Sequence, residues 1–292
     1  MMSPVCESVH ACCNRVVVAI PASFVSDTPH LREKTFRIGL VGRAAAIFKV
    51  NEIIVYPDML NVDQARDAEL LASILSYMET PQYLRKKLFR IRRELRYAGV
   101  LPPLRTPHHP LINRLKKLNI GEYREGVVVS SSTRGSFTDV GVEQPAFILG
   151  KKLPPNTRLT VKITQLQKQF LATLASREEI GTYWGYKATI SKAPFVQLIK
   201  KRNFNLVIAT SRKGKLITQV TDAIKEKWKT SKKILIAFGA PTQGLYEIVA
   251  QEHKRLEEIV RFIVNTIPYQ GTKTVRTEEA LCATLAILNA FY

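Results

Sequence analysis

Short, continuous apolar runs recur in the first and last thirds of the chain, and a polar loop follows each of them. Runs of this kind are typical of strands that are buried on both faces, as in a parallel sheet covered by helices. We predict strands at 14–20, 52–56, 206–210, 234–239 and 261–268, and a further strand or strand–helix edge at 35–41 that leads into a short helix at 42–48. Helical spacing of apolar residues predicts helices at 63–78, 82–98 and 248–258.

The middle of the chain has a different period. Short apolar segments follow one another there, separated by glycines and prolines, and a run of such strands is typical of a small, OB-like barrel. We predict its strands at 126–130, 136–142, 145–149, 158–164 and 170–174. The expected fold class is therefore α/β: a parallel-sheet domain formed by 1–105 and 185–292, interrupted by a small OB-like β-barrel at 106–184.

The last predicted helix carries no charge after its first turn. Thr277 is a suitable N-cap, and Glu278 and Glu279 follow it where the helix dipole favours anions. Every side chain at 280–292 is uncharged. A helix that is apolar on all sides is buried, either in a core or against a second copy of the protein.

One side of this helix is enough to cover a sheet. The stripe at helical spacing consists of Leu281, Leu285 and Leu288. The other side includes Ile287 and Phe291, and exposing it would cost a few kcal/mol at ~25 cal/mol per Å² of apolar area. We therefore predict a homodimer that pairs through this helix.

The formal net charge of +20 is distributed unevenly. Residues 185–233 carry 13 basic and 2 acidic side chains, and the predicted helix 82–98 carries seven basic side chains against Glu94 alone. Charge that is gathered in patches points to a polyanion, most often a nucleic acid. The cations that we expect to contact it are Arg85, Lys86, Arg90, Arg93, Arg124, Arg212 and Lys213.

Missing patterns exclude several other classes of site. The four cysteines form no CxxC pair, and the adjacent His108 and His109 cannot readily converge on one ion, so we expect no metal. Neither a dinucleotide fingerprint nor a triphosphate-binding loop is present. No apolar run approaches 18 residues, so we expect no membrane span and a cytoplasmic protein with reduced thiols. Residues 1–13 are expected to be a loose extension without a signal peptide.

Three of the predicted strands end in loops of one kind, with the sequences SRKG, APTQGL and YQGTKTVRT. In open α/β sheets, ligands bind at the carboxyl ends of the strands. Glycines in these loops permit close approach of the main chain, and apolar neighbours could cover a flat base, which suits a ligand without phosphates such as S-adenosylmethionine. The cofactor-binding residues that we expect are Thr210, Ser211, Phe238, Gly239, Pro241, Gly244, Leu245, Ile267, Pro268, Gln270, Gly271, Thr274 and Val275.

Three motifs resemble those of the SPOUT superfamily, RNA methyltransferases whose C-terminal segment threads a trefoil knot. They are LVGRAAAIFKV, FGAPTQGL and IPYQGTKTVRTEEALCATLAI, in this order along the chain. EYREGVVV and YWGY resemble the ends of the barrel that is inserted in the archaeal and eukaryotic branch. The resemblance implies a trefoil-knotted parallel sheet, S-adenosylmethionine as the cofactor, RNA as the polyanion, and a homodimer with each pocket close to the subunit boundary.

The resemblance also implies catalytic candidates. Arg43 matches the arginine that ends the first motif in many members and would lie beside the methyl-transfer site, although it could also be an ordinary arginine at the N-terminus of a helix. Arg276 and Glu278 lie beside the final loop and could instead bind phosphate and begin the helix. We expect a SAM-dependent RNA methyltransferase that acts on a base nitrogen or ribose 2′-oxygen of rRNA or tRNA. The alternative is a non-catalytic RNA-binding or ribosome-assembly protein with a knotted fold.

Overall fold

The computed structural model describes residues 14–290, which form two compact units. The first unit comprises the described residues up to Asp27, the segment Val50–Ala68 and the described residues from Thr189 onward. The second comprises Thr28–Lys49 and Glu69–Ala188. The expected extension at 1–13 and its three cysteines lie outside the described residues, as does Phe291.

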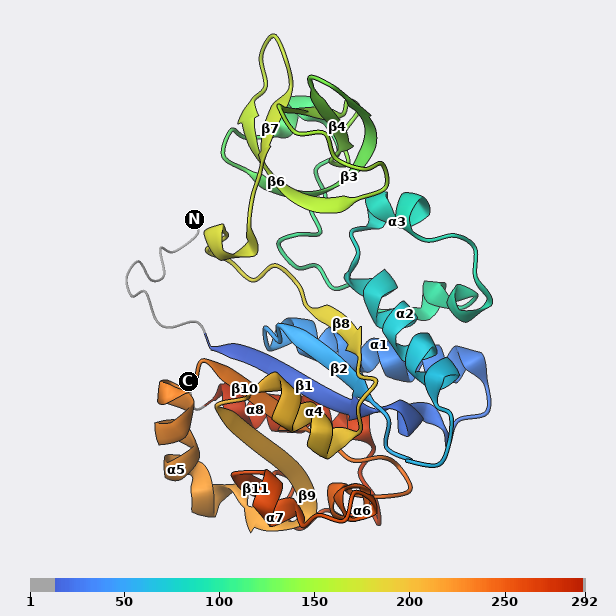
Figure 1. Cartoon of the computed structure of the whole chain (residues 1–292), viewed down its shortest axis with the longest axis vertical. Helices are drawn as coiled ribbons and strands as arrows, with labels where there is room; N and C mark the ends of the chain where they lie inside the picture. Colours follow the sequence, from blue (N-terminus) through green and yellow to red (C-terminus); the bar gives the residue numbers. More distant parts are fainter. Residues whose placement is uncertain (1–13, 291–292) are drawn as a thin grey trace. The chain divides into compact units, whose positions relative to one another are not determined.

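The first unit is built on a six-stranded sheet in the order β11-β9-β10-β1-β2-β8 (Figure 1). Its strands are β1 (Arg15–Pro21), β2 (Glu52–Tyr56), β8 (Lys187–Ile190), β9 (Leu206–Leu216), β10 (Lys233–Ala237) and β11 (Phe262–Asn265). The five strands from β11 to β2 run parallel to one another. The predicted parallel sheet is therefore confirmed, and the three strands with similar loops are neighbours in it.

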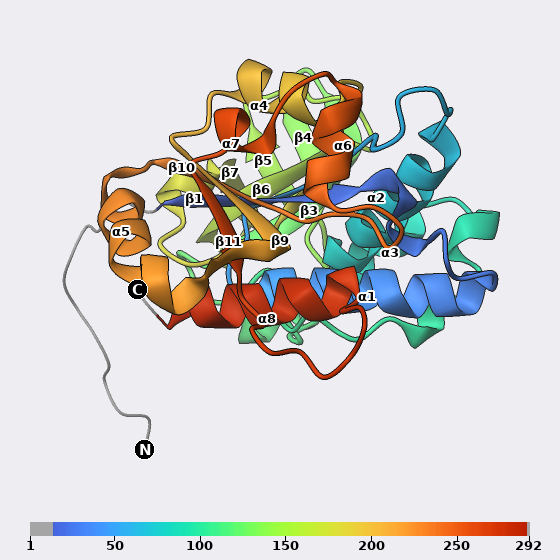
Figure 2. The same ribbon diagram turned by 90° about the horizontal axis from the view of Figure 1, so that it is seen from below.

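Helices cover both faces of this sheet, which explains why its strands are apolar without alternation. Figure 2 shows α8 on one face and α4, α6 and α7 on the other, while α5 packs against β9 and β11. These helices are α4 (Phe195–Arg202), α5 (Ile217–Thr230), α6 (Leu245–Gln251), α7 (Leu256–Ile259) and α8 (Thr277–Asn289), with a 3-10 turn, η1, at Ala22–Val25. One core joins Val17, Leu235 and Val207 of the strands to Phe195 and Ile248 of the helices.

The last helix is buried on one side only, within this chain. Leu281, Leu285 and Leu288 are buried as expected, whereas Cys282 and Ala286 are exposed. The uncharged sequence therefore leaves one face of α8 without a partner among the described residues.

The second unit contains a closed barrel in the order β3-β4-β5-β7-β6. Its strands are β3 (Tyr123–Ser132), β4 (Gly135–Asp139), β5 (Ala146–Leu149), β6 (Arg158–Gln165) and β7 (Leu171–Leu174). Inward residues of alternate positions, such as Ile148, Val161 and Ile163, fill the barrel core. All five predicted strands are confirmed.

The segment 35–41 is not a strand, and this prediction is wrong. It lies inside one helix, α1 (Leu31–Ile47). Two glycines of this helix allow close packing: a Cβ at Gly39 would lie 2.9 Å from the side chain of Leu101, and one at Gly42 would lie 2.6 Å from the hydroxyl of Tyr186.

The predicted helix 82–98 is also wrong beyond its first two turns. α2 (Ala65–Glu79) is followed by α3 (Gln82–Leu88), and then by two 3-10 turns, η2 (Arg93–Leu95) and η3 (Ala98–Val100). Phe89 adopts an extended backbone and packs edge-on against Tyr77, and Ile91, expected on the apolar stripe, is fully exposed. Like charges three and four residues apart destabilise a helix, and this sequence crowds them.

The predicted helix 248–258 divides into α6 and α7. His253 has a positive φ of 53°, a conformation that ends a helix. The third predicted strand of this half, 261–268, is shorter than expected because the chain turns away after Asn265.

A buried ionic cluster joins α2 to the barrel and to the segment before it. Arg158 of β6 contacts Glu79 at 2.7 Å and Glu125 of β3 at 2.6 Å. The ring of His108 lies 3.2 Å from the same Glu79 carboxylate, and that of His109 lies 2.6 Å from its main-chain oxygen. Burial alone would raise the pKa of Glu79, but the hydrogen bond with His108 and the charge of Arg158 lower it to about 2.

Neither histidine of this cluster belongs to a group of three or more potential metal ligands among residues 14–290. In the same part of the chain, no helix is long and apolar enough to cross a membrane. The trefoil knot and the domain limits 1–105, 106–184 and 185–292 stay predictions.

Candidate functional site

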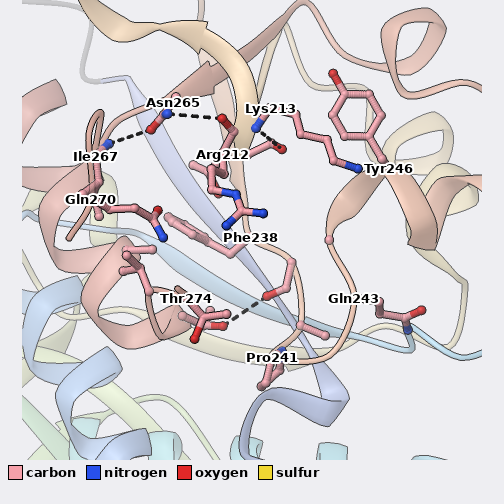
Figure 3. Close-up of a pocket in the computed structure, with 18 of the residues that line it drawn as sticks. Arg212, Lys213, Phe238, Pro241, Gln243, Tyr246, Asn265, Ile267, Gln270 and Thr274 are labelled. Carbon is pink, nitrogen blue, oxygen red and sulfur yellow. Dashed lines mark hydrogen bonds between the residues drawn. The ribbon is translucent and has the colours of Figure 1, made fainter. Parts of the chain in front are cut away.

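A cavity of about 370 Å³ opens in the first unit where β9, β10 and β11 end (Figure 3). Three loops enclose it: the turn within β9, the loop after β10 and the loop between β11 and α8. Because parallel neighbours end at the same edge of the sheet, three loops that are distant in sequence meet there.

The first loop is an excursion within β9. Ala209 pairs with Ile263, and the next paired residue, Lys215, faces Val264, so residues 210–214 leave the ladder. The chain rejoins β11 closely, since a Cβ at Gly214 would lie 2.7 Å from the main chain of Val264. The sequence placed the end of this strand at residue 210 and missed its continuation.

The second loop folds back on itself. A Cβ at Gly239 would lie 3.0 Å from the Cα of Gly244, and the amide of Ala240 donates to the carbonyl of Gln243 at 2.9 Å. The side chain of Gln243 in turn donates to the main-chain oxygen of Asp58 at 2.9 Å. The loop is therefore held closed by its own main chain and by a neighbouring loop of the same unit.

The third loop is tied to the other two. The side-chain amide of Asn265 donates to the carbonyl of Arg212 at 3.2 Å, and the guanidinium of Arg212 donates to the carbonyl of Lys273 at 3.0 Å. The hydroxyl of Thr277 donates to the carbonyl of Gly239 at 3.1 Å. Thr277 was expected to be an N-cap, but Arg276 occupies that position and Thr277 begins the helix.

The cavity carries more positive than negative charge. Arg212, Lys213 and Lys273 line it, and Glu247 is the carboxylate among its described lining residues. Glu247 pairs with Lys213 at 3.2 Å. The pKa of Glu247 is lowered, first by a hydrogen bond with its own main-chain amide and then by Lys213. Arg212, Phe238 and Gln270 all line the cavity (Figure 3), and the side chains of Arg212 and Gln270 both donate to the carbonyl of Lys273.

Most of the residues expected to bind the cofactor line this cavity. They are Thr210, Ser211, Phe238, Gly239, Pro241, Gly244, Ile267, Gln270, Thr274 and Val275. Leu245, Pro268 and Gly271 do not line it: Leu245 belongs to the core, and a Cβ at Gly271 would meet nothing within 4 Å. No other part of the described chain packs closely enough against Gly271 to require a glycine there.

Other lining residues were missed from the sequence, among them Asn265, Lys273 and Tyr246. Asn265 is the last residue of β11, and Tyr246 lies in the first turn of α6. Their positions at the end of a strand and the start of a helix could have identified them as lining residues.

Residues 15–288 match the sequence profile of a protein family described as "Putative RNA methyltransferase". The chain belongs to this family. Proteins named 28S rRNA (uridine-N(3))-methyltransferase, from Mus musculus and Homo sapiens, are each 33% identical to it over 303 residues, which cover 93% of this chain and 75% and 77% of those proteins. An uncharacterized protein of Halobacterium salinarum is 29% identical over 287 residues, covering 93% of this chain and 98% of that protein.

The resemblance to SPOUT RNA methyltransferases is thereby confirmed at the level of the family, and the protein is an RNA methyltransferase. Its three catalytic candidates do not line the cavity. Arg43 belongs to the second unit, where it donates to the carbonyls of Pro103 and Leu104. Glu278 is buried and Arg276 is exposed at the start of α8. Their roles in the methyltransferase stay predictions.

Two of the expected RNA contacts are engaged inside the methyltransferase. Arg124 is fully buried, where it pairs with Glu122 and donates to the carbonyl of Ile112, so the expectation of an RNA contact for Arg124 is not supported. Arg85 donates to the carbonyls of Thr80 and Met78, near the end of α2.

The remaining cations are exposed, although Arg212 donates to the carbonyl of Lys273 and Lys213 pairs with Glu247. Lys86, Arg90 and Arg93 are exposed on the segment that was expected to be one helix, and Arg212 and Lys213 are exposed at the cavity. Arg212 and Lys213 were expected to contact RNA, and both also line the cavity.

Proposed function

We propose that this methyltransferase transfers a methyl group from S-adenosylmethionine to N3 of a uridine in ribosomal RNA. The observation that carries the proposal is the cavity formed by the three strand-end loops, whose rim is cationic. The activity printed in the names of the mouse and human relatives supports the choice of acceptor.

The lining fits an adenosine-bearing cofactor in its chemistry. Phe238, Ile267 and Val275 offer apolar surface for a flat base, and the main chain at Gly239 comes close to Gly244 without intervening side chains. The uncharged, polar side chains of Gln270 and other lining residues suit the ribose hydroxyls. When bound, the cofactor would supply an electrophilic methyl group on a sulfonium.

The cationic rim suits the acceptor. Uridine N3 becomes nucleophilic when it loses its proton to the solvent, and the negative charge then spreads over N3 and the two ring carbonyl oxygens. Arg212 and Lys213 would stabilise that charge within the partly enclosed cavity. Positioning accounts for much of the remaining acceleration, because the nucleophile must lie in line with the methyl group.

Methyl transfer from radiolabelled S-adenosylmethionine to ribosomal RNA tests the proposal. We expect incorporation that yields 3-methyluridine after digestion to nucleosides. Label that appears as a 2′-O-methylated nucleoside would refute the choice of atom. Binding of both S-adenosylmethionine and RNA without transfer to unmodified ribosomal RNA would favour the non-catalytic alternative.

A further inference from the structure

The outer face of the barrel carries an aromatic pair that the cavity does not use. Phe137 of β4 and Phe147 of β5 are cross-strand partners, with ring centroids 4.8 Å apart and ring planes inclined at 46°. Their row continues to Ser130 of β3 on one side and Leu171 of β7 on the other. A single row of outward side chains therefore crosses four of the five strands.

These rings are accessible although their strands are part of a closed barrel. Phe137 is 40% exposed, and Leu149, two residues beyond Phe147 on the same face, is 72% exposed. Phe147 lies against the sheet, since a Cβ at Gly135 would come within 2.7 Å of its ring. Glycine at this position allows the ring to lie low and leaves its outer side open.

The strands that carry this face are also free of acidic side chains over most of their length. Arg134 is the one charged residue in the segment 126–138. Lys151 and Lys152 are the two charged residues in the segment 145–157. All three cations are exposed, and they gather at one end, where the amide of Gly150 donates to the carbonyl of Arg134.

We propose that Phe137, Phe147, Leu149 and the three cations form a platform for unpaired RNA nucleotides, and we call it the aromatic face. Bases stack on flat rings irrespective of sequence, and nearby cations follow the phosphates of the same strand. This inference rests on the proposed function, since it names how the methyltransferase holds a single-stranded part of its RNA substrate.

The charge distribution favours RNA over a second copy of the protein as the occupant. Two copies that met through this face would bring Arg134, Lys151 and Lys152 of each against the same cations of the other, with no acid on these segments to neutralise them. Duplex RNA hides the faces of its bases, so the aromatic face selects unpaired nucleotides.

The test measures binding of a fluorescent oligouridylate of about 12 nucleotides to the full chain, by anisotropy. We expect the double variant Phe137→Ala/Phe147→Ala to bind at least about tenfold more weakly, with an unchanged dependence on salt, because stacking is removed while the same phosphates stay neutralised. Lys151→Ala/Lys152→Ala should instead lower the salt slope, by ~0.7 for each phosphate that is no longer neutralised.

Leu174→Ala is the matched control, because Leu174 of β7 is 41% exposed and aliphatic. We expect it to bind the oligouridylate as the wild type does, and a duplex of the same length should be insensitive to the double variant. Unaltered oligouridylate binding by the double variant would overturn the inference, as would a change in sedimentation without a change in RNA binding.

The inference and the proposed function fail separately. If oligouridylate binding depends on the two rings but no methyl transfer occurs, the aromatic face is supported and the proposed function is refuted. If methyl is transferred to ribosomal RNA but the double variant binds oligouridylate as the wild type does, the proposed function is supported and the aromatic face is refuted. Binding of S-adenosylmethionine, measured by calorimetry, should be equal in all these variants and shows that the first unit is intact.

Discussion

The hydroxyl of Thr277 donates a hydrogen bond to the carbonyl of Gly239, across 3.1 Å. Thr277 is the first residue of α8 and Gly239 lies in the loop after β10, so one bond joins the start of the last helix to a loop that folds back on itself. The three loops are consequently held by contacts among themselves, before any ligand is considered.

Replacing Thr277 by valine should weaken this arrangement. The carbonyl of Gly239 would lose its donor, and a lost hydrogen bond of this kind costs about 1 kcal/mol of stability. Because the loop would loosen, we also expect weaker binding of S-adenosylmethionine, measured by calorimetry. Thr221→Val is the control, since the hydroxyl of Thr221 donates to the carbonyl of Ile217 within α5. Equal losses of affinity in both variants would contradict the assigned role.

Gly239 and Gly271 should respond differently to alanine. The Cβ of Gly239→Ala would lie 3.0 Å from the Cα of Gly244, so the loop must shift, and we expect the affinity for S-adenosylmethionine to fall by about tenfold. The Cβ of Gly271→Ala would meet no atom within 4 Å, and we expect nearly unchanged affinity. The opposite order in calorimetry would show that Gly271, and not Gly239, approaches the ligand.

Arg212→Ala should reduce methyl transfer more than cofactor binding. Its guanidinium faces the cavity and is expected to stabilise developing charge on the uracil, a contribution that typically amounts to about 2.7–4 kcal/mol, or about 10²- to 10³-fold in rate. Single-turnover transfer and calorimetry separate the two effects. Arg202→Ala serves as a control for loss of a basic side chain, because Arg202 of α4 pairs with buried Glu52. Equal rates for Arg212→Ala and the wild type would refute the role.

Acid should destabilise the second unit in two steps. The folded pKa of His109 is lowered from 6.5 to about 4, by burial and by His108, so its contribution is fully present above pH 6.5 and is lost as the pH falls toward 4. The folded pKa of Glu79 is about 2 against 4.5 in the unfolded chain, so its contribution is lost between about pH 4.5 and 2. Urea unfolding from pH 7 to pH 3 should show both, and Glu79→Gln should remove the lower step. A pH-independent midpoint would contradict this account.

The exposed face of α8 should mediate pairing of two chains. Sedimentation is expected to give about twice the chain mass of 33.0 kDa. Ala286→Asp places a charge on the exposed side of α8 without disturbing its buried leucines, and it should yield monomers. Gln219→Asp, on the exposed side of α5, should leave the mass unchanged. A monomeric wild type would rule out the predicted homodimer.

Buried strands were predictable from sequence because short, unbroken apolar runs between polar loops are typical of strands that are covered on both faces. Val17, Ile54 and Leu235 each lie on strands whose two faces are covered, so every position after the first, charged residue was apolar and the run was visible. The barrel strands were equally clear, because glycines and prolines mark their ends.

Glycines and charges misled where their neighbours in space decided the outcome. The segment 35–41 was expected to be a strand or strand–helix edge, but its Gly39 and the following Gly42 allow other segments to pack against a continuous helix. Leu84, Leu88, Ile91 and Leu95 recur at helical spacing, yet Phe89 packs against Tyr77 and Ile91 lies in solvent. Contacts of this kind join residues that are distant in sequence, so the local spacing of apolar residues does not predict them.

The cavity could be located from the three loops, but the role of each side chain within it could not. Leu245 and Gly244 are adjacent in sequence, and only Gly244 lines the cavity because α6 begins between them and turns Leu245 into the core. Arg124 looked like any other cation, yet it is an internal partner of Glu122. Burial, which sequence does not report, separates these cases.

The interleaving of the two units also determines the order in which the chain can fold during synthesis. β1 lies between β2 and β10, so its pairing with Lys233 and the residues after it must wait until most of the chain has left the ribosome. Glu69–Ala188 is one uninterrupted stretch and includes the whole barrel, whose contacts can form earlier. Pairings between distant residues form slowly, and until β10 arrives one edge of β1 stays open to incorrect partners. The nascent protein can therefore fold its barrel before it has the sheet edge at which the cavity forms.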